Sequence, residues 1–167
     1  MYSHLMEVLE IDSFKKTQLE LLFRATKSQN NFPAFLKAVA HTENLLFLIH
    51  IWESDKIIGA YVSTPIEGEG IISDPNAYIF SVTGCRKFPC KHTKCIEVGN
   101  GNLIKFGRDL AIRTNCLDEE SDCEWPTMFE GDASLKNPSQ WLAGDRHFQI
   151  ENLEVYQLVE EEIEMVM

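Results

Sequence analysis

The fold of this chain follows from one apolar run, Leu45-Leu46-Phe47-Leu48-Ile49-His50-Ile51-Trp52. A polar turn, Glu53-Ser54-Asp55-Lys56, separates it from a second apolar run at residues 57–62, and this pattern predicts a β-hairpin. The first run is apolar at successive positions rather than at alternate ones, which is typical of a strand covered on both faces. We therefore expect residues 45–52 to occupy the middle of a sheet.

Two helices are expected before the hairpin. In the segment 32–40, apolar side chains recur at the spacing of one helix face, and Pro33 stands in the first turn, where a proline loses no hydrogen bond. A shorter helix is expected at residues 3–10. The segment 19–25 is apolar enough to be a buried strand or the end of a helix, and both interpretations stay open.

Most of the remaining chain predicts short strands and loops. The expected strands are at residues 78–82, 93–98, 109–113 and 148–159. In the last of them the alternation shifts phase at Glu151-Asn152, as a β-bulge would produce. Two long loops, 63–76 and 114–131, are long enough to carry function.

Many strands with one clear helix predict a mainly β protein of the α+β class. We expect two antiparallel sheets packed face to face as a two-layer β-sandwich, with helices at the periphery. A chain of 167 residues has room for one such domain. The sequence divides into an N-terminal helical leader at 1–18, the globular domain at 19–158 and an acidic C-terminal tail at 159–167.

Charge and hydropathy exclude several partners. With 26 acidic against 15 basic residues the net charge is −11, so a nucleic-acid backbone or an anionic lipid surface would be repelled over most of the protein. The longest apolar run has eight residues, far short of the ~20 that a membrane-spanning helix needs, so we expect no direct membrane insertion. The N-terminus lacks the basic and apolar regions of a signal peptide, which predicts a cytoplasmic protein.

One group of soft ligands raises the question of zinc: Cys85, Cys90, His92 and Cys95. Its spacing is not that of a zinc knuckle, and three interspersed lysines would repel a cation, so we expect no metal. No phosphate-binding glycine pattern is present either, and we expect no cofactor. Five cysteines are an odd number, so we expect no disulfide framework and mostly reduced thiols.

Three side chains are candidates for chemistry. Asp109 and Glu154 are acids within apolar strands, where an unpaired charge would be costly, so we expect partners that make them structural; a functional acid with a raised pKa is the alternative. Cys123 lies in an acid-rich loop, where we expect it to be exposed and open to oxidation, with a pKa raised by its acidic neighbours. No nucleophile elbow accompanies these residues, and we expect no enzyme.

Five segments, taken in order, resemble the TLDc domain of oxidation-resistance proteins and their relatives. They are Leu21–Thr26, Ile58–Ser63, Ser73–Ser81, Ile104–Ile112 and Phe148–Tyr156. The combination of Ser-Asp-Pro-Asn-Ala-Tyr-Ile-Phe-Ser at 73–81 with Leu-Glu-Val-Tyr at 153–156 carries most of the resemblance. Together the segments span roughly residues 19–158.

The resemblance implies a two-sheet β-sandwich flanked by helices and no established catalytic activity. It also implies a role in resistance to oxidative stress and binding to the V1 sector of the vacuolar proton-pumping ATPase (V-ATPase), with recruitment to the membranes that carry this pump. Cys123 resembles a family cysteine to which an antioxidant role has been attributed.

The leading hypothesis is a non-enzymatic module whose loops 63–76 and 114–131 bind a protein partner and change its assembly or activity. The candidate contact residues in and near these loops are Trp125, Phe129, Trp141, Asp74 and Asn76. The three aromatic residues have the alternative of closing the core. Two other hypotheses are a thiol-based antioxidant that uses Cys123 and a structural subunit of a larger assembly.

Overall fold

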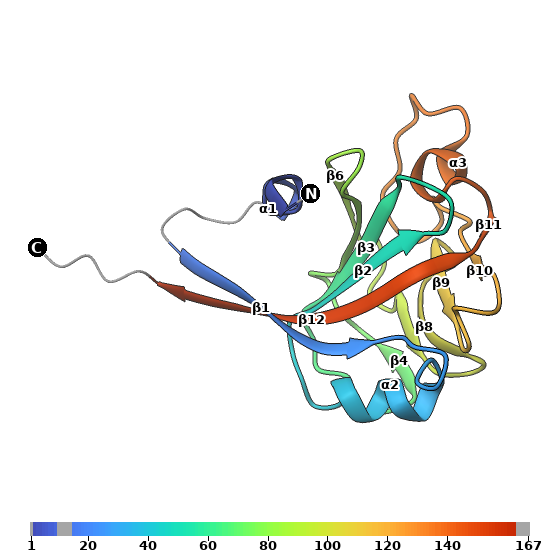
Figure 1. Ribbon diagram of the computed structural model, residues 1–167. Helices are drawn as coiled ribbons and strands as arrows, with labels where there is room; N and C mark the ends of the chain where they lie inside the picture. Colours follow the sequence, from blue (N-terminus) through green and yellow to red (C-terminus); the bar gives the residue numbers. More distant parts are fainter. Residues whose placement is uncertain (1, 10–14, 163–167) are drawn as a thin grey trace, which may run out of the picture.

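The computed structural model describes residues 2–9 and 15–162. These residues form two six-stranded antiparallel sheets that pack face to face, with short helices around them (Figure 1). In order across the first sheet, the strands are β1 (Lys15–Arg24), β12 (Ile150–Glu162), β2 (Leu45–Ile51), β3 (Ile57–Val62), β5 (Tyr78–Ser81) and β6 (Arg86–Pro89). Across the second they are β11 (His147–Phe148), β10 (Ser121–Asp122), β9 (Leu110–Arg113), β8 (Asn102–Phe106), β7 (Ile96–Val98) and β4 (Gly70–Ile72). The expected mainly β sandwich is confirmed.

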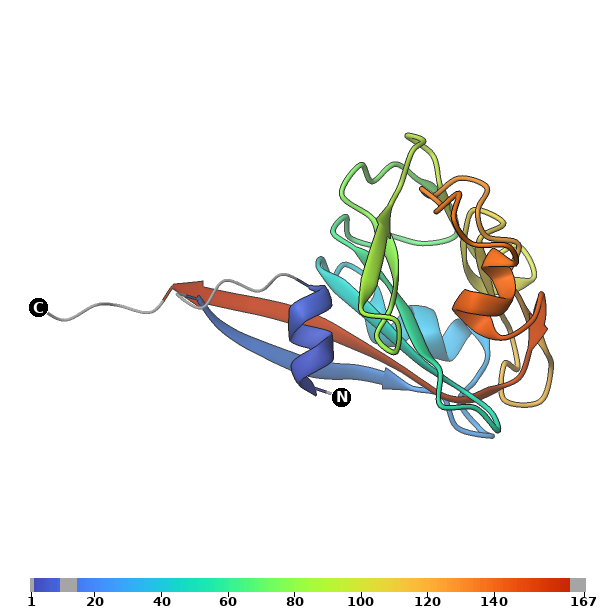
Figure 2. The same cartoon turned by 90° about the horizontal axis from the view of Figure 1, so that it is seen from above.

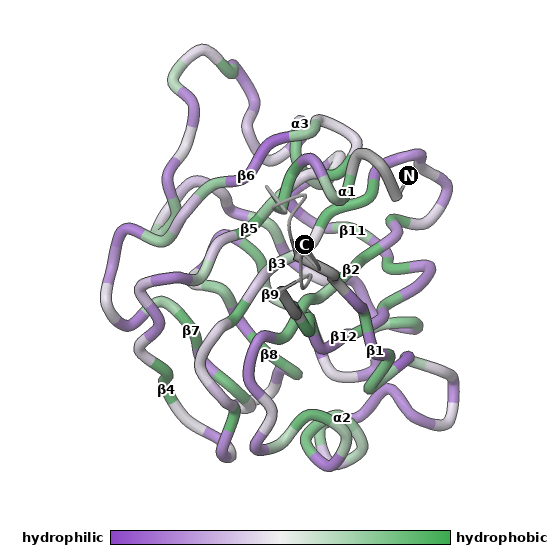
Figure 3. Tube along the Cα trace, turned by 90° about the vertical axis from the view of Figure 1, so that its left-hand side faces the viewer, coloured by the Kyte–Doolittle hydropathy of each residue, from purple (hydrophilic) through white to green (hydrophobic). Residues whose placement is uncertain are grey.

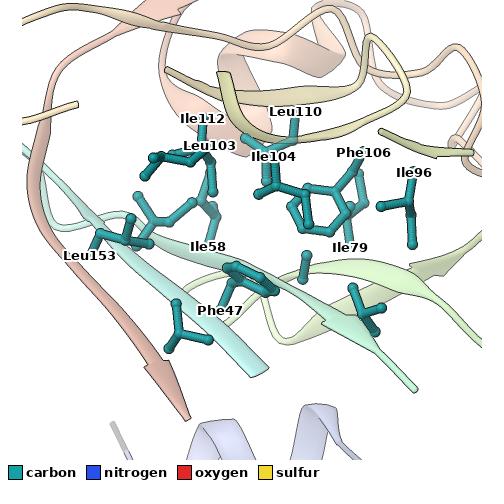
Figure 4. Close-up of a cluster of buried hydrophobic side chains, with 14 of the residues drawn as sticks. Phe47, Ile58, Ile79, Ile96, Leu103, Ile104, Phe106, Leu110, Ile112 and Leu153 are labelled. Carbon is teal, nitrogen blue, oxygen red and sulfur yellow. The ribbon is translucent and has the colours of Figure 1, made fainter. Parts of the chain in front are cut away.

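The apolar run at 45–52 forms β2, which lies between β12 and β3 in the first sheet. Its odd-numbered side chains, such as Phe47, face the second sheet, where the Phe47 and Phe106 rings meet edge to face at 5.4 Å between centroids (Figure 4). Its even-numbered Leu46 belongs to a second apolar cluster on the outer face. Both faces are covered, as expected, which is why β2 is apolar at successive positions.

Helices α2 and α3 add side chains to the core between the sheets, whereas α1 covers the outer face of the first sheet. Helix α2 (Phe32–Val39) buries Phe35 and Val39 and is capped by the Asn31 side chain, which accepts a hydrogen bond from the Ala34 amide at 2.9 Å. Helix α1 (Tyr2–Val8) lies on the outer face of the first sheet (Figure 2). Helix α3 (Pro138–Ala143) lies beside the end of the β2–β3 hairpin. Hydrophobic residues are most frequent along the central strands and helix α2, and many of the connections are hydrophilic (Figure 3).

The ends of the chain differ from the expected division. Residues 19–25 lie in or directly after strand β1, which begins at Lys15, inside the segment predicted as a helical leader. Strand β12 continues to Glu162, into the segment predicted as a tail, and the two strands pair as a ribbon that projects from the body (Figures 1 and 2). Because β1 and β12 pair with each other, each strand continues beyond its apolar residues. The predicted bulge is confirmed, because the register of β12 against β2 shifts between Ile150 and Asn152.

Neither long loop is irregular throughout. The segment 63–76 contains β4, which pairs with β7, and the segment 114–131 contains β10, which pairs with β9 and β11. Both strands have only two or three residues, too few for a visible alternation.

Candidate partner-binding surface

A buried aspartate fixes the loop 63–76. The Asp74 carboxylate accepts hydrogen bonds from the Ser63 amide (2.6 Å) and hydroxyl (2.7 Å), the Thr64 amide (3.1 Å) and the Asn76 amide (3.0 Å). These four donors compensate the cost of burying a charge. Asp74 was expected to contact a partner, but it is fully buried because the loop folds around it; Asn76 is exposed.

A second buried aspartate fixes the loop 114–131 in the same way. The Asp109 carboxylate accepts hydrogen bonds from the amides of Thr127 (2.7 Å), Met128 (2.8 Å) and Phe129 (3.1 Å), and from the Thr127 hydroxyl. Asp109 itself lies in the β8–β9 turn. These hydrogen bonds therefore hold residues 127–129 of the loop against the β8–β9 turn of the second sheet.

Glu154 joins β12 to β1. Its carboxylate accepts hydrogen bonds at 2.7 Å from Arg24 of β1, from the Tyr156 hydroxyl and from the Asn152 side chain. Burial raises the pKa of this carboxyl, but these hydrogen bonds and the Arg24 charge outweigh burial and hold the pKa below its ordinary value. Burial and the nearby Glu154 carboxylate raise the pKa of Tyr156 to about 12.

The aromatic candidates mostly close the core. Trp125 and Phe129 are buried, and the Trp125 ring packs on Phe88 at 4.5 Å and on Trp141 at 6.0 Å between centroids. The Trp125 indole N–H donates to the Glu130 carbonyl at 2.9 Å, which satisfies its polar group inside the protein. Trp125 and Phe129 are thus not available to a partner, and Trp141 is partly exposed.

Cys123 is buried, not exposed as its acid-rich surroundings suggested. Burial, with smaller contributions from the charges of Asp109 and Glu124, raises the pKa of this thiol to about 11. Both effects disfavour the thiolate that reacts with peroxide. The sequence showed the acids of the loop but not the sheet beneath it.

Three of the five cysteines are free thiols, in line with the expectation of mostly reduced cysteines, and the other two are paired. Cys90 and Cys95 form a disulfide in the connection between β6 and β7, which links the two sheets. The other three cysteines, Cys85, Cys116 and Cys123, are free.

Within residues 2–9 and 15–162, no group of three or more His, Cys, Asp or Glu side chains could hold a metal ion. No helix in the same residues is long and apolar enough to cross a membrane.

The structure exposes a tryptophan that the sequence analysis did not select. Trp52 follows the last residue of β2, and its side chain is 52% exposed. It borders two surface hollows, one of about 540 Å³ shared with Lys27 and Leu117 and one of about 250 Å³ shared with Phe148 and Gly144. No local signal distinguished Trp52 from the rest of the run, because Leu46, also at an even-numbered position, is buried on the outer face of the sheet.

Hydrogen bonds hold the turn that carries Trp52. The His50 ring donates from Nε2 to the Ser54 carbonyl at 3.0 Å, and the Ser54 hydroxyl accepts from the Lys56 amide at 3.1 Å. The Lys56 ammonium donates to the Trp141 carbonyl in α3 at 2.9 Å. Trp52 is therefore an exposed aromatic side chain on a fixed support.

The comparisons with known proteins agree with this architecture. A match to the TLDc domain covers residues 1–159, which is nearly the entire chain. Comparison with curated proteins gives no match. Because the TLDc domain match covers nearly the entire chain and the structure is a two-sheet sandwich, the chain belongs to the TLDc domain family.

Proposed function

We propose that this chain is a non-enzymatic protein-binding module that regulates the V-ATPase by binding its V1 sector. In this proposal it acts in the cytoplasm, is recruited to membranes through the pump, and contributes to oxidative stress resistance by that route. Membership of the TLDc family, whose domains are generally non-catalytic, supports a binding role. The buried Cys123 gives no support to a thiol-based antioxidant.

The observation that carries the proposal is the exposure of Trp52. Half of a large aromatic side chain in contact with water is unfavourable, and tryptophan is enriched among the residues that dominate protein–protein binding. The two flanking hollows can accept side chains of a partner around it. Because the hairpin is fixed at the centre of the first sheet, little conformational entropy is lost on binding.

The test is capture of V1 subunits from cytosol by the immobilised full chain, with and without Trp52→Ala. We expect the wild type to recover V1 subunits and Trp52→Ala to recover about tenfold less or worse, as for a central aromatic contact. Leu21→Ala is the matched control, because Leu21 is an apolar side chain with a similar exposure of 48% on β1.

Two results would contradict the proposal. One is a wild-type chain that recovers no V1 subunit from cells rich in the pump; the other is a Trp52→Ala chain that recovers as much as Leu21→Ala. A complex that stays stoichiometric through purification would instead indicate a fixed structural subunit.

A further inference from the structure

The outer face of the second sheet carries basic side chains on a strongly acidic protein. A hollow of about 330 Å³ lies there over β8, β9 and β10. Its charged lining includes Lys105, Arg108, Arg113, Asp122 and Glu124. The question is which of these charges are already neutralised within the protein.

Both acids of the hollow are paired to arginines. Asp122 accepts from the Arg113 guanidinium at 2.9 Å, and Glu124 from Arg146 at 2.9 Å. Lys105 and Arg108 form no ion pair with any residue in the described part of the chain. Glu97 lies opposite Lys105 in the β7–β8 ladder without forming an ion pair with it. The hollow therefore presents two uncompensated cations.

An apolar hollow continues the basic one. It has a volume of about 190 Å³ and shares Lys105 and Arg108 with its neighbour. Its wall includes Ile71, which is 63% exposed, and Met128, together with the charged side chains of Lys94 and Glu97. Ile71 belongs to the loop 63–76 and Met128 to the loop 114–131, so the two loops meet at this point.

We propose that these two hollows bind an extended acidic segment of a protein partner, at a surface that adjoins a Trp52 hollow at His147 but does not include Trp52 itself. A carboxylate of the segment lies between Lys105 and Arg108, and an apolar side chain packs on Ile71 and Met128. An inorganic anion has the charge but not the apolar group that the Ile71 and Met128 wall would accept. The observed lining thus favours a peptide over a free anion.

The test is fluorescence anisotropy of the purified full chain with a labelled octapeptide of alternating glutamate and leucine. A second octapeptide carries glutamine in place of glutamate. The variant Lys105→Gln/Arg108→Gln removes the two cations that both hollows share, from partly or fully exposed positions. The control Lys37→Gln/Lys136→Gln makes the same change in net charge at exposed lysines outside both hollows.

We expect the wild type and the control to bind the glutamate peptide and Lys105→Gln/Arg108→Gln to bind it about tenfold more weakly, as for the loss of charge-assisted hydrogen bonds. Ile71→Ser weakens it too, and Trp52→Ala does not, which separates this site from the proposed V1 contact. Three results would overturn the proposal. They are an equal loss of affinity in the Lys37→Gln/Lys136→Gln control, equal affinity for the glutamine peptide, and displacement of the glutamate peptide by inorganic phosphate at a concentration equal to that of the peptide.

Discussion

At the scale of the residue, two buried aspartates account for the shape of the functional loops. Asp74 and Asp109 each collect four hydrogen bonds on one carboxylate, and each does so from a loop of more than ten residues. Asp109 was expected within an apolar strand and lies in the turn just before β9, but the apolar residues beside it made a partnered, structural carboxylate predictable. Asp74 lay in a loop with turn residues on both sides, so nothing local distinguished a buried carboxylate from an exposed one.

The burial of Cys123 was likewise not predictable from its neighbours in the sequence, and it leads to a prediction about its reactivity. Because its thiol is buried and burial raises the pKa to about 11, we expect iodoacetamide to leave Cys123 unmodified at neutral pH in the folded protein. In urea the same thiol becomes accessible and is alkylated. Peptide mass spectrometry measures both states.

Cys85 provides an internal comparison, since it is only half-buried and shares the sample. We expect Cys85 to be modified before Cys123 in the folded protein. Alkylation of Cys123 at the same rate with and without urea would contradict the buried placement and would restore the thiol-based antioxidant as a hypothesis.

At the scale of the element, patterns within one segment predicted well and patterns between segments did not. The β2–β3 hairpin, helix α2 and the bulge of β12 were predictable because their signals lie in consecutive residues. Strands β4, β6 and β10 have two to four residues each and are defined by hydrogen bonds to distant partners. The pairing of β1 with β12 joins residues more than 120 positions apart, which no local pattern contains.

Glu154 makes the β1–β12 pair sensitive to pH. Its folded-state pKa is held below the ordinary value, so its contribution to stability is complete above the ordinary glutamate pKa and is lost as pH falls through the lowered value. We expect urea unfolding to show a free energy that drops below about pH 4.5. Glu154→Gln should lower the stability at neutral pH and flatten this dependence.

The control for this prediction is Glu20→Gln, which changes an exposed glutamate on the same strand pair. We expect this variant to keep the wild-type slope below about pH 4.5. If Glu154→Gln instead follows the wild-type curve at every pH, the interactions of this carboxylate with Arg24 and Tyr156 do not contribute to stability.

At the scale of the whole molecule, burial decided which predicted site residues could act. Trp125 and Phe129 lie in a polar segment of sequence, but that segment folds over the open end of the sandwich and places both rings inside it. Trp52 lies beside the most apolar run of the chain, yet the hairpin ends there and leaves it exposed. Exposure depends on how the sheets and loops cover one another, so the surface that could bind a partner had to come from the structure.

The arrangement of layers predicts how the molecule responds to loss of α1. Leu5, Val8 and Leu9 pack on Leu46 and its neighbours on the outer face of the first sheet, in a cluster separate from the core between the sheets. We expect deletion of residues 1–9 to leave a cooperatively folded sandwich that is less stable by about 2–5 kcal/mol, the scale for uncovering two or three such side chains. Urea unfolding measures the loss.

The uncovered face gives a second measurement on the same variant. Leu46, Phe80 and Val82 become exposed when α1 is removed, so binding of the dye ANS to the folded protein should increase. Leu5→Ala should reproduce part of the stability loss with little dye binding, since the helix still covers the sheet. Unchanged stability and dye binding after deletion would mean that α1 does not pack on the sheet, whereas complete unfolding would mean that the inter-sheet core is insufficient without it.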